Sequence, residues 1–90
     1  MSSNSDVYIA PELLNKRSVP DLYQKRDKLF GYQVVDLSSV HEIDSAGLAL
    51  LVKWAKCQSS GKLKLIGIPD TALRLIKTYK LTPLFELECK

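Results

Sequence analysis

The feature that most constrains the fold is an apolar segment at residues 32–37, with the sequence YQVVDL. Its adjacent valines, Val34 and Val35, place apolar side chains on both faces of a strand, which is typical of a strand inside a parallel sheet. Parallel strands need a crossover connection, usually a helix. The segment therefore predicts an α/β fold with residues 32–37 as an interior strand.

The rest of the chain supplies the alternation that such a fold requires. β-branched, aromatic or alternating apolar residues predict strands at residues 7–10, 63–66 and 84–89. Helical spacing and terminal residues predict helices at residues 18–30, 45–60 and 70–80. The order β-α-β-α-β-α-β indicates a largely parallel sheet with right-handed crossovers.

Capping residues mark the ends of these helices, and periodicity marks the core. Ser18 and Asp70 are expected to cap the first and third helices, and Gly61 to end the second. On the third helix, Tyr79 and Lys80 could extend the inner side. The residues expected to be largely buried are Val34, Val35, Leu37, Leu48, Leu51, Val52, Leu65 and Ile76.

Size and composition indicate one globular domain spanning residues 1–90, with residues 1–5 as a disordered tail. Hydrophobic residues make up 46% and charged residues 26% of the chain, which are ordinary values for a folded protein. No apolar run approaches the roughly 20 residues that cross a bilayer, and the start lacks the features of a signal peptide. Cys57 and Cys89 sit among apolar residues and are expected to be buried, reduced thiols. The protein is expected to be cytoplasmic.

Few residues could carry catalytic or metal chemistry. His41 is the single histidine, and Asp36, Glu42 and Asp44 around it would form a weak acid cluster. The glycines are isolated, so no phosphate-binding loop is present, and the net charge of +3 is low for a nucleic-acid binder. We expect no catalytic residue, metal, cofactor or nucleic-acid partner, while a small ligand at the sheet edge stays open.

A constellation that invites a functional interpretation lies at residues 36–48, where a buried strand ends and a helix begins at Asp44 and Ser45. The free amides of the first turn and the helix dipole would stabilise a negative group on Ser45. Gly47 would leave space above this turn for a partner's backbone. Alternatively, Asp44 or Ser45 simply caps the helix, and both interpretations stay open.

The same helix carries two apolar stripes. One must face the sheet and consists of Leu48, Leu51, Val52 and Ala55; the other consists of Leu50, Trp54 and Cys57. Either the flanking helices cover Leu50 and Trp54, or a partner protein does. An exposed Trp54 would be a plausible interface anchor.

Residues 35–40 (VDLSSV) and 43–51 (IDSAGLALL) resemble the core signature of STAS domains, which anti-sigma-factor antagonists and sulfate transporters share. In the family, a Ser or Thr follows the Asp at the head of the second helix, and in the antagonists it is phosphorylated. Ser45 stands at that position. The resemblance, over roughly residues 7–87, implies a STAS-like mixed β-sheet with helices mainly on one face.

Within the family, residues 47–52 and 76–81 look most like the MlaB group, the small STAS subunits of a phospholipid-transport ABC complex in Gram-negative bacteria. This resemblance implies a non-enzymatic protein that binds and supports the ATPase subunit. It would lie in the cytoplasm, peripheral to the inner membrane through its partner. The alternative is an anti-sigma-factor antagonist whose partners are an anti-sigma factor and a kinase that phosphorylates Ser45.

The resemblance also departs from the family pattern at the start of the chain. STAS domains usually open with a strand before the one at residues 7–10, and we expect this first family strand to be missing here. A missing edge strand would leave unpaired backbone groups and favour a homodimer.

The partner surface is expected to centre on the start of the second helix. Its predicted contacts are Asp44, Ser45, Ala46, Gly47, Leu50 and Trp54. A basic rim of Lys53, Lys56, Arg74 and Lys77 would surround them. Such a rim would speed encounter with an acidic partner and make binding salt-sensitive.

Overall fold

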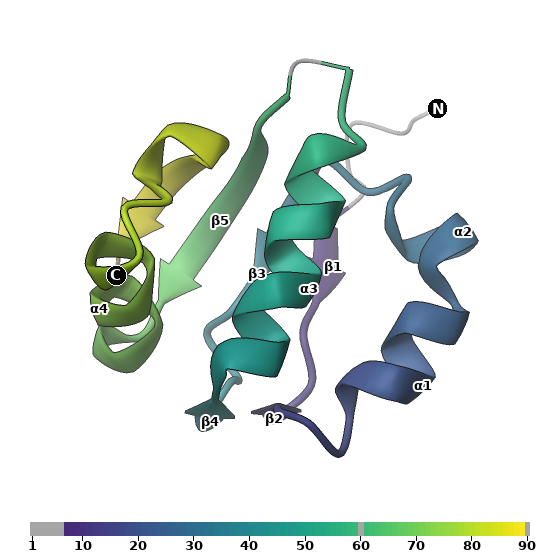
Figure 1. The fold of residues 1–90 in the computed structure, drawn as a ribbon, viewed down its shortest axis with the longest axis horizontal. Helices are drawn as coiled ribbons and strands as arrows, with labels where there is room; N and C mark the ends of the chain where they lie inside the picture. Colours follow the sequence, from purple (N-terminus) through teal and green to yellow (C-terminus); the bar gives the residue numbers. More distant parts are fainter. Residues whose placement is uncertain (1–6, 60, 90) are drawn as a thin grey trace.

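Four parallel strands form the main sheet of the computed structural model, which describes residues 7–59 and 61–89 (Figure 1). They lie in the order β1-β3-β5-β6, with bounds β1 (Val7–Ile9), β3 (Val34–Asp36), β5 (Leu63–Ile68) and β6 (Phe85–Cys89). The interior position predicted for residues 32–37 is confirmed, because β3 lies between β1 and β5. The recorded pairings are all parallel rather than mixed, since a crossover containing a helix joins each pair of neighbouring strands.

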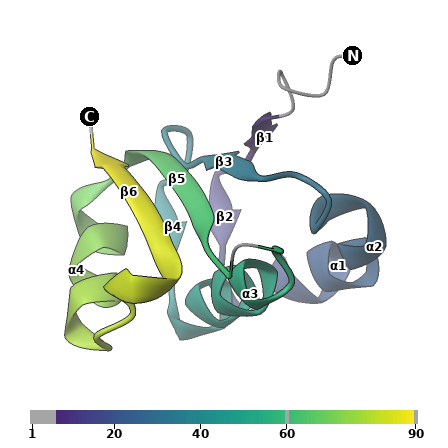
Figure 2. The ribbon, with the colours of Figure 1, turned by 90° about the horizontal axis from the view of Figure 1, so that it is seen from above.

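The helices are α1 (Val19–Gln24), α2 (Arg26–Leu29), α3 (Ser45–Lys56) and α4 (Asp70–Thr78), followed by a 3₁₀ turn at Thr82–Leu84. Figure 2 shows them on one face of the main sheet, as predicted. The helix predicted at residues 18–30 is broken at Lys25, where the backbone bond tightens to the i−3 carbonyl of Leu22. Ser18 does not cap α1 with its side chain; its hydroxyl instead donates to the Leu13 carbonyl.

A second, two-stranded parallel sheet was not predicted. It pairs β2 (Leu13–Leu14) with β4 (Glu42–Ile43), in segments that the sequence presents as connections. Strands of two residues carry no periodicity, so only the tertiary contact defines them. The backbone N–H of Asp44 continues this ladder by donating to the Leu14 carbonyl at 3.1 Å. The small sheet therefore anchors the start of α3.

Several element ends differ from the prediction. Helix α3 ends at Lys56 rather than near residue 60, and Gln58 ties the following turn to the Phe30 carbonyl. Strand β5 continues to Ile68 through Gly67, whose φ of 62° suits glycine. Pro69 occupies the N-cap of α4, so Asp70 lies in the first turn and is not the cap.

The core lies between the main sheet and the helices. Of the residues predicted to be buried, six are: Val35, Leu37, Leu48, Leu51, Leu65 and Ile76. Val34 is half-buried because it lies on the sheet face that the helices leave open, between Val7 and Lys64. Val52 is half-buried at the edge of α3.

Three further expectations concern thiols and termini. Cys57 is exposed at the end of α3, so the prediction that it is buried is wrong. The Cys89 side chain and the tail at residues 1–5 lie outside the described residues. Strand β1 stands at the edge of the described sheet, and the missing family strand and the homodimer remain predictions.

Candidate protein-binding surface

The first turn of α3 is organised by Asp44, not by Ser45. The Asp44 Oδ1 atom accepts hydrogen bonds from the backbone N–H groups of Ala46 at 2.9 Å and Gly47 at 3.1 Å. Its Oδ2 atom accepts one from the Lys16 N–H at 3.1 Å. Burial opposes ionisation, but these three donors and the Lys16 ammonium outweigh it and lower the pKa of Asp44. Asp44 is therefore a structural cap, which leaves the Ser45 hydroxyl free for other contacts.

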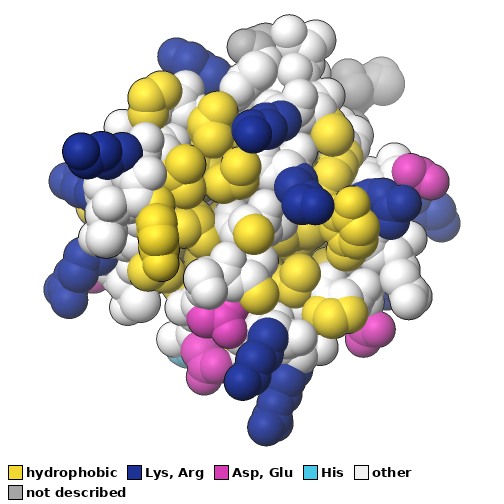
Figure 3. Space-filling view, viewed as in Figure 1, with side chains coloured by type: hydrophobic (Ala, Val, Ile, Leu, Met, Phe, Trp, Pro, Cys, Tyr) yellow, Lys and Arg dark blue, Asp and Glu magenta, His cyan; other side chains and the backbone are white. Residues whose placement is uncertain are grey.

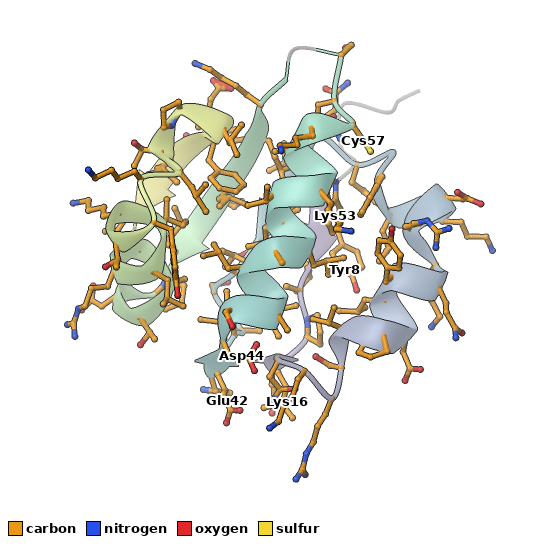
Figure 4. All side chains as sticks on the ribbon, viewed as in Figure 1. Tyr8, Lys16, Glu42, Asp44, Lys53 and Cys57 are labelled. Carbon is orange, nitrogen blue, oxygen red and sulfur yellow. The ribbon has the colours of Figure 1, made fainter. Side chains whose placement is uncertain are left out.

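Ser45, one of the predicted partner contacts, is exposed at the first position of α3. Figure 4 places Asp44 at this end of the helix, near Lys16 and Glu42, with Lys53 and Cys57 farther along α3. Ala46, the next residue, is half-buried and its backbone N–H is engaged by the cap. A group added to the Ser45 oxygen would thus project outward from the helix start, where the dipole favours negative charge.

Gly47 does not make room for a partner. A Cβ atom at this position would lie 2.1 Å from the Leu14 carbonyl oxygen and 2.9 Å from the Leu14 Cβ. The glycine is buried against β2 and permits close contact between α3 and the small sheet. Its predicted role in partner binding is therefore wrong, because the space above it is filled by the domain's own backbone.

Trp54 and Leu50 are also internal, being 1% and 2% exposed. The Trp54 Nε1 atom donates to the Tyr32 carbonyl at 3.0 Å, and its ring lies 5.4 Å from that of Phe30 and 5.6 Å from that of Tyr8. Burial and the neighbouring Tyr32 raise the pKa of Tyr8 in the same cluster. The prediction of Trp54 and Leu50 as direct partner contacts is wrong, because the domain's own side chains cover this side of α3.

The buried residues of α3 merge the two predicted stripes into one broad face. At about 100° per residue, Gly47, Leu48, Leu50, Leu51, Trp54 and Ala55 span roughly 160° of the helix circumference. The opposite face consists of Ser45, Ala49, Lys53 and Lys56, which are all exposed. We call these four residues the α3 ridge. It is the part of the helix that a partner can reach.

A groove of about 470 Å³ runs along one side of the α3 ridge. Leu48, Ala49 and Val52 line it from the helix, and Tyr79 and Leu81, which follow α4, line it from across. We call it the α3–α4 groove. Tyr79 is 55% exposed, because it lies at the end of α4 rather than on the inner side expected from the sequence. The groove thus pairs an apolar floor with an accessible aromatic ring.

A second groove, of about 600 Å³, runs along the other side of the ridge. Tyr23, Arg26, Asp27 and Phe30 line it from α1, α2 and the residue after them, and Cys57 closes its end. We call it the α2–α3 groove. The space-filling view shows apolar side chains gathered over α3 and its neighbours, with Lys and Arg side chains among them (Figure 3).

Two of the four residues predicted to form a basic rim line the grooves. Lys53 and Lys56 line both grooves. Arg74 and Lys77 are exposed on α4, but neither lines a groove. Their positive charges can contribute to this surface only through a longer-range electrostatic field.

The acid residues around His41 have separate structural roles. Glu42 accepts a hydrogen bond from the Asn15 Nδ2 atom at 2.7 Å, and Asp36 accepts two from Ser38. The His41 backbone N–H donates to the Glu12 carbonyl. Across residues 7–59 and 61–89, the His, Cys, Asp and Glu side chains form no group of three that could hold a metal ion.

The sequence interpretation missed several residues of this surface, among them Ala49, Tyr79 and Leu81. Ala49 lies four residues from Ser45 and four from Lys53, so helical spacing alone could have placed it on the ridge. Tyr79 closes the last turn of α4, where its N–H donates to the Leu75 carbonyl at 3.0 Å. Leu81 carries no such signal, because its position depends on how the chain leaves α4. There Lys80 takes a positive φ of 58°.

Comparison with known families agrees with this architecture. A family model described as "Mlab, STAS domain" matches residues 11–86, which is most of the chain. A search of curated proteins found no match. The matched region contains the strand, turn and helix that place Ser45 at the start of α3. The chain therefore belongs to the STAS domain family, and its domain is of the MlaB-like kind.

Proposed function

We propose that this protein is a non-enzymatic STAS subunit that binds and supports the ATPase subunit of a phospholipid-transport ABC complex, which maintains outer-membrane lipid asymmetry. The observation that carries the proposal is the α3–α4 groove, an accessible apolar groove that begins at Ser45. Apolar grooves with an aromatic wall are typical sites for a partner's side chains. The MlaB-like family match supports the choice of partner.

The residues of this surface favour binding over catalysis. Among the described residues, no basic side chain is hydrogen-bonded to the Ser45 hydroxyl, and both oxygens of the Asp44 carboxylate accept from backbone N–H groups, those of Ala46, Gly47 and Lys16. In the part of the chain that the structure describes, no helix is long and apolar enough to span a membrane. We propose that the protein lies in the cytoplasm and is held at the inner membrane by its partner, as in the MlaB-like group that its domain resembles.

The exposure of Ser45 also favours a second function, that of an anti-sigma-factor antagonist switched by phosphorylation. Both functions use the same end of α3, since a phosphate there would meet the positive helix terminus. They differ in partner. Phosphorylation of Ser45 by a dedicated kinase, with loss of binding to an anti-sigma factor, would favour the antagonist.

Pull-down from the native host, with identification of bound proteins by mass spectrometry, tests the proposal. The ATPase subunit should co-purify with the wild-type chain. Ser45→Asp should weaken this binding at least tenfold without unfolding the domain. Gln33→Asp is a matched control, because Gln33 is exposed before β3 and lines neither groove. Equal binding by both variants would contradict the proposal.

A further inference from the structure

The α3 ridge separates two grooves, and its two lysines serve both of them. Lys53 and Lys56 line the α3–α4 groove and the α2–α3 groove alike. A partner that enters either groove must therefore pass these ammonium groups. A partner at this surface therefore needs apolar side chains for the groove and negative charge near the two lysines.

The charged residues lining the α3–α4 groove are Lys53 and Lys56, and the α2–α3 groove adds Arg26 and one acidic residue, Asp27. The described lining of the α3–α4 groove contains no acidic residue. Within residues 7–59 and 61–89, no acidic side chain forms an ion pair with Lys53, Lys56 or Arg26. Arg26 and Lys53 instead lie over the Tyr23 ring, at 4.3 and 5.1 Å from its centroid. These contacts hold Arg26 and Lys53 beside the α2–α3 groove without neutralising their charges.

The backbone around the grooves is already used. The backbone of α3 is engaged by the hydrogen bonds of the helix and, at Ala46 and Gly47, by the Asp44 cap, and side chains rather than a strand edge line the grooves. An extended peptide would therefore find no backbone partners here, whereas a helix satisfies its own. The geometry favours a helical occupant.

We infer that the occupant is an acidic amphipathic helix of the protein partner. Its apolar face fills the α3–α4 groove against Ala49, Val52 and Tyr79, and its carboxylates face Lys53 and Lys56. The inference rests on the function proposed above, because it names the chemistry of the partner at the same surface. An anionic lipid surface would match the charge, but not a recessed groove that requires protruding side chains to fill it.

Charge reversal tests the inference. Lys53→Glu combined with Lys56→Glu should lower affinity for the co-purified ATPase subunit by at least a hundredfold and weaken its salt dependence. Lys25→Glu combined with Lys28→Glu is a matched control. These exposed lysines have the same spacing of three residues and the same charge change, but they line neither groove. The control should change affinity less than threefold, and circular dichroism should show both variants folded.

The outcomes separate this inference from the proposed function. If Ser45→Asp abolishes binding but reversal of the ridge lysines does not, the partner surface stands and the acidic helix is wrong. If the wild-type chain binds no ATPase subunit, both fail. Rescue of the double variant by changing carboxylates to lysines on one partner helix would support the inference. Binding of the wild type, but not the double variant, to vesicles of phosphatidylglycerol and phosphatidylcholine, without such rescue, would overturn it.

Discussion

The side of α3 that holds Trp54 is apolar and covered by the domain, whereas the side that holds Ala49 is exposed and also carries Ser45 and two lysines. Trp54 is 1% exposed and its indole N–H is paired with the Tyr32 carbonyl, whereas Ala49 is exposed on the floor of a groove. The larger residue stabilises the fold, and the smaller one leaves the space that a partner can fill. The comparison shows that position around a helix, rather than side-chain size, separates core from binding surface.

Trp54→Ala should have the largest effect on the buried side. Removing the indole leaves a cavity among Tyr8, Phe30 and Tyr32, and such truncations cost about 3–5 kcal/mol of unfolding free energy. Urea denaturation measures this loss. Affinity of the remaining folded protein for the partner should be unchanged. A lower affinity with unchanged stability would instead show that Trp54 is an interface residue. The two sides of α3 would then not differ in role.

Gly47→Ala should come next, at about 2–3 kcal/mol. The added methyl group would overlap the Leu14 carbonyl, so α3 or β2 must shift. The reason is steric and lies on the buried side of α3. Thermal unfolding measures this loss of stability. Ala46→Gly, at the neighbouring half-buried position, is the variant for comparison. A fully stable Gly47→Ala variant would show that this contact is looser than the structure indicates.

Asp44→Ala should lower stability by about 1–2 kcal/mol, because it removes the cap of α3 and the link to Lys16. Since the folded-state pKa of Asp44 lies below its ordinary value of 3.8, this stability is present above pH 3.8 and is lost as the pH falls through the folded pKa. Denaturation curves of wild type and Asp44→Asn between pH 2 and 7 measure the difference. Parallel curves across that range would argue against an ionised cap.

Ala49→Gln should have the smallest effect on stability, within about 0.5 kcal/mol, because the residue is exposed and both side chains suit a helix. Its effect on binding should be large, since the longer side chain occupies the groove. Calorimetric titration with the ATPase subunit should show affinity reduced about tenfold. Unchanged affinity would show that Ala49 is not part of the binding surface. The surface would then be limited to the side of the groove that holds Tyr79.

The sequence predicted the elements of the main sheet better than it predicted the surface. The adjacent valines of β3 and the spacing of α3 reflect burial, which periodicity records directly. The β2–β4 pairing depends on contacts between distant segments, which no local pattern records. Trp54 shows the same limit, because its spacing fits a core helix and a docking helix equally well.

The candidate site follows the same division. Ser45 was predicted to be exposed because the strand, the turn and the cap around it are local features. Leu81 could not be placed on the groove, because its position depends on the left-handed conformation of Lys80 and the path of the chain after α4. Gly47 was misassigned because its neighbour, Leu14, lies 33 residues earlier in the chain, in an unpredicted strand.

A photocrosslinking residue placed at position 49 tests the central claim most directly. The account predicts that, in cells, this position on the exposed side of α3 forms a crosslink to the ATPase subunit. The same crosslinker at position 33, before β3, should form none. Crosslinks from position 33 but not from position 49 would contradict the claim that the α3 ridge and its grooves are the partner surface.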